Sequence, residues 1–455
     1  MHRRKTIKTV LSLFLAVSAG VALMSEATVA AADPSTGNCQ YEDADEIYNK
    51  EWDCFRYGGF YEPPNPLPLG SPGDLIRSEP LHLVLEPSGQ LGSFDATGTR
   101  IMYRSVDAVG KPIAITGTYF EPHNPWPGQG PRPLISYAAG TMGLGDQCAP
   151  SRLFEQGIHW SSGADITLNY EEGFIETLVA RGFAVVMTDY QGFGTPGVHT
   201  FLNRLASGHA VIDAARAAKH LQGTSLSPQG PVAFMGYSQG GGAVASAAEL
   251  ASQYAPELQI VGTYAGAPPS DLKDLLRQQD GSVFVGAASY ILNSIISAYP
   301  ESEEWVRGKL NERGLQFLDS VKNQCVVETM LKYQFRHLQP FFVDNFPDIL
   351  DEEPLSTLLE IQRIGSLKPN APVLIVSNRY DPLVSWLGAN QIGQDWCRQG
   401  AQVEFRTNEE PPFLNKLIVN HILTMFVDGE PSMQWLADRF NRVPFTGNCD
   451  NIENW

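Results

Sequence analysis

The sequence is poor in basic residues, and beyond its first 24 residues it has no long apolar run. It carries 32 Lys and Arg against 50 Asp and Glu, which gives a formal net charge of −18. Such a chain lacks the basic surface that nucleic-acid binding requires. The same charge repels anionic membrane surfaces. After Met24 no segment approaches the roughly 20 apolar residues of a spanning helix. We therefore expect neither a nucleic-acid partner nor a membrane span in the main part of the chain.

What the sequence does contain is ample material for a large core. Hydrophobic residues make up 43% of its 455 positions and charged residues 18%. This balance excludes an intrinsically disordered or collagen-like chain.

The N-terminus has the layout of a secretory signal peptide. A basic segment runs from His2 to Lys8, an apolar segment from Val10 to Met24, and small residues at 28–32 follow. The apolar segment is too short for a membrane anchor. We predict cleavage near Ala30 or Ala32, and Arg3-Arg4 raises the twin-arginine route as an alternative for export.

The cysteine pattern agrees with export. All six cysteines lie beyond the signal segment, and none forms a C-x-x-C motif: Cys39, Cys54, Cys148, Cys325, Cys397 and Cys449. An even count in an oxidising compartment predicts three disulfides, whereas zinc and redox sites are disfavoured. Proximity favours Cys39–Cys54, and the residues alone leave the other pairings open.

The rest of the chain predicts an α/β fold. Short β-branched runs at 101–106, 112–120, 134–138, 183–188, 232–237, 260–264, 373–377 and 403–406 predict strands, with helices at 172–180, 205–222 and 240–253 between them. Continuous apolar strands alternating with helices favour a mostly parallel sheet covered on both faces. The alternation stops near Pro268 and resumes near Ala371, and the intervening segment looks helical, for example at 288–298 and 338–350.

The strongest chemical signal is the pentapeptide Gly236-Tyr237-Ser238-Gln239-Gly240. It follows a buried strand at 232–235 and precedes a small-residue run that opens a helix. This strand–turn–helix context is the nucleophile elbow of the α/β-hydrolase fold, with glycines where the helix packs close to the strand. We predict that Ser238 is a nucleophile.

A serine nucleophile needs a histidine base and a carboxylate that orients it, and both come after the serine along an α/β-hydrolase chain. Of the two later histidines, His337 falls in the helical insertion, whereas His421 follows the last predicted strand. Asp381 follows the strand at 373–377, where a catalytic carboxylate is expected. We therefore predict a Ser238–His421–Asp381 triad, with Asp395 and Glu404 as fallback acids.

The tetrahedral intermediate of such a reaction needs two N–H donors. The first is expected to be the amide of Gln239, and the second an amide in the Gly140–Thr141 region of the loop after the strand at 134–138.

A second glycine motif is a decoy. Residues 192–197 match G-x-G-x-x-G, but Pro196 interrupts them and no helix follows at once, so we do not expect a dinucleotide site. Asp189 precedes the nucleophile, and we assign it a structural role.

Several segments, taken together, resemble the secretory lipase family, the lipase A type of α/β-hydrolase. The resemblance spans most of the chain, through residues 102–107, 140–146, 148–151, 189–194, 213–218, the elbow, 266–272 and 438–440.

The resemblance implies a secreted carboxylic ester hydrolase with an inserted helical cap. It supports the triad and implies Cys148–Cys325 and Cys397–Cys449 disulfides. The expected division is 1–32 signal peptide, 33–90 N-terminal extension, 91–270 and 366–455 hydrolase core, and 271–365 cap. We expect a triacylglycerol lipase that acts as a monomer on a lipid ester, without a metal or cofactor.

Other functions are compatible with the same residues. A short-chain or aromatic esterase, a polyester hydrolase or an acyltransferase would use the same triad, and a peptidase or an inactive surface-binding protein would share the fold. The aromatic cap segment at 338–346 would suit a lipid surface if exposed, or an ordinary cap–core contact if buried.

Overall fold

The fold is described from a computed structural model for residues 59–85, 92–161, 164–414 and 417–452. The predicted signal peptide and the Cys39–Cys54 disulfide lie outside these residues. The chain divides into two compact units, 1–60 and 61–455, and only Gly59 and Phe60 of the first are among the described residues. All helices and strands of the described residues belong to the second unit.

A nine-stranded mixed sheet forms the centre of this unit, in the order β1-β2-β3-β7-β4-β8-β9-β10-β11. Its strands are β1 (Leu75–Leu81), β2 (Ala96–Val106), β3 (Pro112–Pro122), β4 (Leu134–Ala138), β7 (Ala184–Thr188), β8 (Val232–Tyr237), β9 (Ile260–Gly266), β10 (Val373–Asn378) and β11 (Val403–Asn408). Strands β7 to β11 in this order are parallel, and β1, β2 and β3 add an antiparallel edge. The prediction of a mostly parallel sheet is confirmed.

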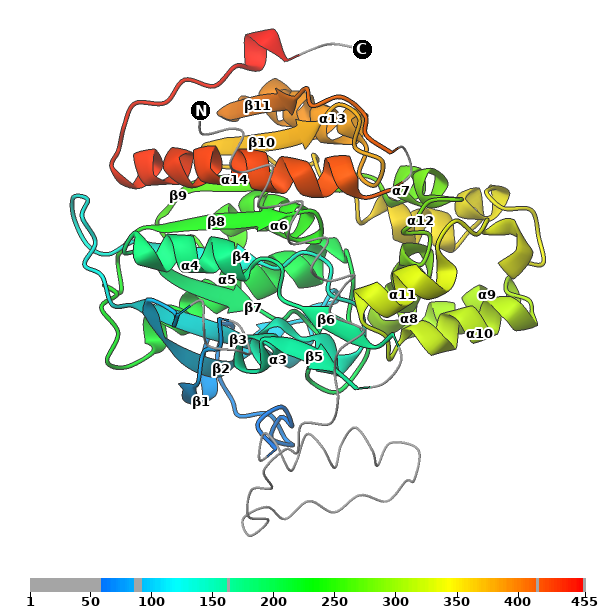
Figure 1. The fold of residues 1–455 in the computed structure, drawn as a ribbon, viewed down its shortest axis with the longest axis horizontal. Coiled ribbons are helices and arrows are strands. Elements are labelled where there is room, and N and C mark those ends of the chain that lie inside the picture. Colours follow the sequence, from blue (N-terminus) through cyan, green and yellow to red (C-terminus); the bar gives the residue numbers. More distant parts are fainter. Residues whose placement is uncertain (1–58, 86–91, 162–163, 415–416, 453–455) are drawn as a thin grey trace. The chain divides into compact units, whose positions relative to one another are not determined.

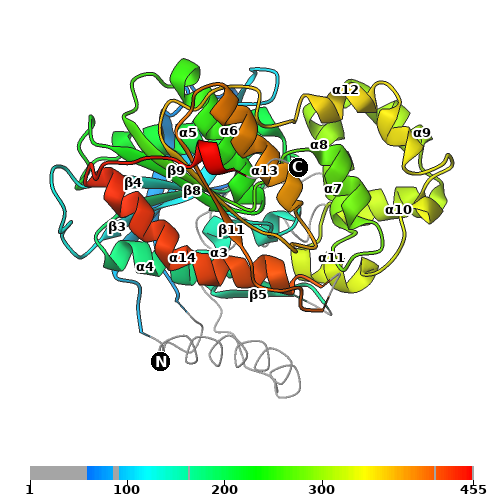
Figure 2. The same cartoon turned by 90° about the horizontal axis from the view of Figure 1, so that it is seen from above.

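Helices cover both faces of the sheet. Helices α5 (Arg204–His220), α6 (Gln239–Tyr254) and α13 (Trp386–Arg398) lie on one face, and α4 (Glu172–Ala180) and α14 (Val419–Phe440) lie on the other (Figure 2). Strands β4, β7, β8 and β10 are buried along their whole length, as expected for strands with helices on both sides. A short helix α3 (Pro150–Gln156) and a hairpin of β5 (Ile158–Trp160) and β6 (Ile166–Leu168) complete the core.

A helical cap lies beyond one end of the strands (Figure 1). It comprises α7 (Leu272–Gln279), α8 (Ala287–Ala298), α9 (Glu303–Gly308), α10 (Glu312–Val321), α11 (Val326–Tyr333) and α12 (Leu355–Glu360). Most of its buried side chains form a hydrophobic cluster separate from that of the sheet. Within the described residues, no helix combines the length and hydropathy needed to cross a membrane.

The cap differs from the prediction over residues 338–350. We expected a helix there, but the segment holds two short 3₁₀ turns, Gln339–Phe341 and Asp348–Asp351. Pro340 and Pro347 explain the difference, because proline removes the amide that a helix interior needs. Phe341 is buried and stacks on Phe317 with ring centroids 4.6 Å apart, so these aromatic side chains largely pack within the cap.

The sheet also begins earlier than the predicted core. Strand β1 pairs with β2, so part of the segment assigned to the N-terminal extension belongs to the sheet. Six of its seven residues are half-buried or exposed, as in an edge strand, so the segment gives little hydrophobic signal.

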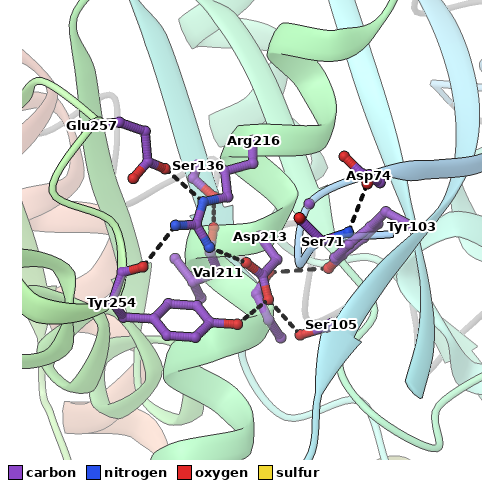
Figure 3. Close-up of polar contacts among 12 residues, drawn as sticks. Ser71, Asp74, Tyr103, Ser105, Ser136, Val211, Asp213, Arg216, Tyr254 and Glu257 are labelled. Atoms are coloured by element: carbon purple, nitrogen blue, oxygen red, sulfur yellow. Dashed lines mark hydrogen bonds and ion pairs between the residues drawn. The ribbon is translucent and has the colours of Figure 1, made fainter. Parts of the chain in front are cut away.

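A buried carboxylate fastens α5 to its neighbours (Figure 3). Asp213 accepts hydrogen bonds from Ser105 Oγ on β2 at 2.7 Å and from the Tyr254 hydroxyl of α6 at 2.9 Å. It also pairs with Arg216 at 2.9 Å, and Arg216 in turn contacts Glu257 at 2.7 Å. Burial raises the pKa of Asp213 to about 6.

Removing this carboxylate should destabilise the protein more than removing its exposed counterpart. At pH 7.5, Asp213→Ala should lower the free energy of unfolding by about 2–4 kcal/mol, because buried hydroxyls and a guanidinium lose their partner. Glu257→Ala should cost less than about 1 kcal/mol, since Glu257 is mostly exposed. Urea unfolding of both variants tests this prediction. Equal losses of unfolding free energy would contradict the stabilising role assigned to the buried Asp213 carboxylate.

Candidate active site

The candidate nucleophile lies in a sharp turn between β8 and α6. Ser238 has φ 58° and ψ −121°, a conformation that costs a non-glycine residue energy. A Cβ on Gly240 would lie 2.0 Å from the carbonyl oxygen of Ala138, and one on Gly236 would lie 2.4 Å from that of Gly240. The two glycines are therefore required by the close approach of α6 to β4 and β8.

The predicted acid and base lie together. Asp381, just after β10, accepts a hydrogen bond from His421 Nδ1 at 2.6 Å. Its other oxygen accepts the amides of Leu383 and Val384 at 2.8 and 3.0 Å, which fixes the carboxylate. Both side chains are buried. With Nδ1 bound to Asp381, Nε2 is the nitrogen left for proton transfer.

His421 lies beside the elbow. It is the third residue of α14, and its carbonyl accepts the hydroxyl proton of Tyr237 at 2.7 Å. The rings of Tyr237 and His421 are 5.1 Å apart between centroids. Since Tyr237 immediately precedes Ser238, the structure brings the three predicted residues to the same end of the sheet, where β8 and β10 end.

The alternative residues have other partners. His337 is exposed in the cap and lies 2.9 Å from Asp280. Asp395 contacts Gln391 at 2.9 Å on its own helix, and Glu404 accepts from Trp435 at 2.9 Å. These contacts favour Asp381 and His421 for the triad.

The first expected oxyanion donor is the backbone amide of Gln239, a residue whose side chain is fixed by a buried hydrogen bond. Gln239 is the first residue of α6, so its amide has no partner within the helix. Its side-chain amide lies 2.7 Å from Nε2 of His199, whose Nδ1 donates to the carbonyl of Gln191 at 3.2 Å. Phe193 stacks on the His199 ring with 4.7 Å between centroids. Sequence reasoning missed His199, which lies 40 residues before its partner.

The two amides of the second expected donor region, those of Gly140 and Thr141, differ in their hydrogen bonds. The amide of Gly140 donates to Glu171 Oε2 at 2.6 Å, so this amide is already engaged. The Thr141 carbonyl accepts from the Tyr170 hydroxyl at 3.2 Å. Among the hydrogen bonds of the described residues, none uses the Thr141 amide, which remains the candidate donor of this loop.

The loop that carries Thr141 is attached to the cap. Cys148 and Cys325 form a disulfide, and Gly143 pairs with Cys325 in an isolated β-bridge. A second disulfide joins Cys397 to Cys449. Both pairings are those implied by the family resemblance.

One cluster of side chains has the atom types of a metal site. Ligand atoms of His159, Asp165 and Cys325 lie within 4.8 Å of one another. Because the Cys325 sulfur is in a disulfide, it offers no thiolate, and the set does not fit a zinc or iron site.

The glycine decoy forms a loop. Gly192 and Gly194 have positive φ, and the next helix begins only at Arg204. Asp189 is buried and accepts from Thr116 Oγ1 at 2.7 Å and the Ser151 amide at 2.8 Å. These contacts agree with the structural role expected for Asp189.

The mixed sheet, the strained serine and the buried Asp–His pair define an α/β-hydrolase. A family model described as "Secretory lipase" matches residues 159–448, so the chain belongs to the secretory lipase family.

Similar proteins occur in bacteria and fungi. A probable inactive lipase of Mycobacterium tuberculosis is 28% identical over 85% of this chain and 82% of its own length. A secreted triacylglycerol lipase of Malassezia furfur is 26% identical over 86% of this chain and 77% of its own length.

A solved structure supports the fold. Candida antarctica lipase A in its closed state superposes with a TM-score of 0.73 at 24% identity, covering 86% of this chain and 87% of its own.

Acid should destabilise the protein through His199. Burial lowers the pKa of His199 from 6.5 to about 4, so the unfolded chain takes up the proton first as pH falls. This contribution to stability is complete above pH 6.5 and is lost progressively toward pH 4. It amounts to about 3 kcal/mol.

In His199→Phe, the free energy of unfolding should therefore fall less between pH 6.5 and 4 than in the wild type. Urea unfolding across this range measures the difference. The exposed His337→Ala variant should show the same dependence of unfolding free energy on pH as the wild type. Parallel curves for all three proteins would refute the contribution of His199 to acid sensitivity.

Proposed function

We propose that the chain is a secreted serine carboxylic ester hydrolase, and that its substrates are triacylglycerols. The observation that carries the proposal is the buried Asp381–His421 hydrogen bond of 2.6 Å, attached through Tyr237 to the strained turn of Ser238. The names of several relatives, secreted triacylglycerol lipases of Malassezia, support the substrate class and the extracellular location. The signal peptide predicted for 1–32 agrees with that location.

The proposed reaction begins with proton transfer from Ser238 Oγ to Nε2 of His421. The Ser238 oxygen attacks the ester carbonyl carbon, and the carbonyl oxygen becomes an oxyanion that the amides of Gln239 and Thr141 stabilise. Asp381 holds His421 in the Nδ1–H tautomer and stabilises the imidazolium. The alcohol leaves with the proton from His421, and an ester of Ser238 remains.

Water completes the cycle. His421 takes a proton from the water molecule, the resulting hydroxide attacks the acyl carbon, and Ser238 regains its proton as the fatty acid leaves. His421 performs the proton transfers in both halves of the reaction, and Asp381 orients it throughout.

A short-chain esterase is the second candidate. The aromatic side chains Phe341 and Phe342 of the cap are buried, which favours the cap contact over the lipid surface among the two interpretations of this segment. An inactive relative is the third candidate, because a probable inactive lipase of Mycobacterium tuberculosis is among the similar proteins.

Hydrolysis of p-nitrophenyl esters from C2 to C16 separates these candidates. Wild-type protein should turn over esters with an optimum at C8 or longer. Ser238→Ala should lose up to about 10⁶-fold in kcat, because the nucleophile is gone. Ser246→Ala, also on α6, is the matched control and should retain activity.

An optimum at C2–C4 would favour the esterase. Equal turnover by wild type and Ser238→Ala would reject Ser238 as the nucleophile, and no turnover by either would favour an inactive relative.

The role of Asp381 has its own test. Asp381→Asn should lower kcat by about 10⁴-fold with little change in fold, because the amide favours the wrong His421 tautomer. Asp395→Asn, which changes a fallback acid, should keep near wild-type kcat. A larger loss in Asp395→Asn than in Asp381→Asn would exchange the two assignments. Steady-state kinetics with the optimal ester measure both.

A further inference from the structure

Two adjacent residues, Tyr170 and Glu171, form hydrogen bonds with the loop that would supply the second oxyanion donor. Glu171 Oε2 accepts the Gly140 amide at 2.6 Å, and the Tyr170 hydroxyl donates to the Thr141 carbonyl at 3.2 Å. The first bond fixes the peptide group before Gly140, and the second fixes the peptide group after Thr141. The amide of Thr141 belongs to the peptide group between these two, which joins Gly140 to Thr141.

Further bonds hold the same loop at its ends. The Ala139 carbonyl accepts from the Tyr190 hydroxyl at 2.7 Å, and the Met142 carbonyl accepts from the amide of Val326 in the cap at 2.8 Å. The backbone of 139–142 is thus held by four bonds from outside the loop. Such preorganisation is what an oxyanion donor requires, since a donor already in place costs no reorganisation during the reaction.

The position of the Tyr170 hydroxyl requires glycine at residue 140. A Cβ on Gly140 would lie 2.3 Å from the Tyr170 hydroxyl and 3.5 Å from Glu171 Oε2. A residue with a side chain would therefore displace the Tyr170 hydroxyl that holds the loop.

Tyrosine side chains surround the Glu171 carboxyl. Glu171 is fully buried, and among the described residues its carboxyl forms no salt bridge and interacts with the side chains of Tyr137, Tyr170, Tyr190 and Tyr264. Its backbone amide donates to Asn169 Oδ1 at 3.1 Å. The Tyr137 hydroxyl lies 3.0 Å from Oε1. Burial raises the pKa of Glu171 to about 8, so the carboxyl is neutral at pH 7.

A neutral carboxyl suits the proposed reaction. It accepts the Gly140 amide without placing a negative charge near the oxyanion that forms on the substrate. A buried acid with no cationic partner is costly for stability, and such costs are expected where function requires the group.

We propose that Tyr170 and Glu171 are positioning residues that hold the Thr141 amide in place for the oxyanion. This inference rests on the proposed function, because it assigns their role in ester hydrolysis. Above pH 8 the ionised Glu171 opposes oxyanion formation, and kcat falls. The four tyrosines around it have pKa values raised above 10 and do not titrate in this range.

The test compares Glu171→Leu, Glu171→Gln and Tyr170→Phe with the wild type, using p-nitrophenyl butyrate and an aliphatic trifluoromethyl ketone. The ketone forms an oxyanion adduct with the nucleophile. Glu171→Leu and Tyr170→Phe should lower kcat at least about tenfold and weaken the ketone in proportion, with KM within about twofold. Glu171→Gln keeps an acceptor for Gly140, so it should restore most of kcat at pH 7 and remove the decline above pH 8.

Asp213→Asn is the matched control, since it changes a buried carboxyl of raised pKa outside this loop. It should leave kcat and ketone affinity unchanged, whatever it does to thermal stability. If Glu171→Leu does not fold, Tyr170→Phe decides the question, because it removes one hydroxyl from the same set of hydrogen bonds.

Unchanged kcat and ketone affinity in Glu171→Leu or, where that variant fails to fold, in Tyr170→Phe would overturn the inference and leave the proposed function standing. So would an alkaline decline that persists in Glu171→Gln. Absence of Ser238-dependent turnover in the wild type would instead overturn the proposed function, and the inference with it.

Discussion

The backbone of Ser238 is the constraint on which the rest of the site depends. Its positive φ forces the chain from β8 directly into α6, and the glycines on either side allow that helix to touch the end of β4. This contact places the first amide of α6 next to the loop that follows β4. The two expected oxyanion donors therefore come from segments about 100 residues apart in sequence, brought together by one tight turn.

Buried polar side chains then secure what the turn has assembled. His199 holds the side chain of Gln239, and Tyr170 with Glu171 holds the opposite loop. Both titratable groups, His199 and Glu171, have pKa values shifted by burial in the direction that keeps them uncharged near neutral pH. These two groups thus add no charge beside the proposed oxyanion at neutral pH, and a site of low polarity strengthens the effect of each N–H donor there.

Sequence reasoning reached the sheet, the elbow and the Asp381–His421 pair because each depends on local pattern and chain order. Strands β4 and β8 were predicted to the residue, since fully buried parallel strands are continuous apolar runs. His199 and Glu171 were missed because their roles arise from contacts across 40 and 31 residues, for which the sequence has no periodic signal. The helix predicted over 338–350 was wrong, because the prediction followed the spacing of apolar residues and gave too little weight to Pro340 and Pro347.

The disulfides make the molecule tolerant of a broken chain. Cys148 and Cys325 are 177 residues apart, and the interval contains Ser238, α8 and much of the cap. A protease that cuts once at an exposed position within this interval leaves two pieces that remain covalently joined. The cut ends stay attached to the folded core, with the nucleophile still beside its partners, so nicked protein can retain its assembled site where proteases are present.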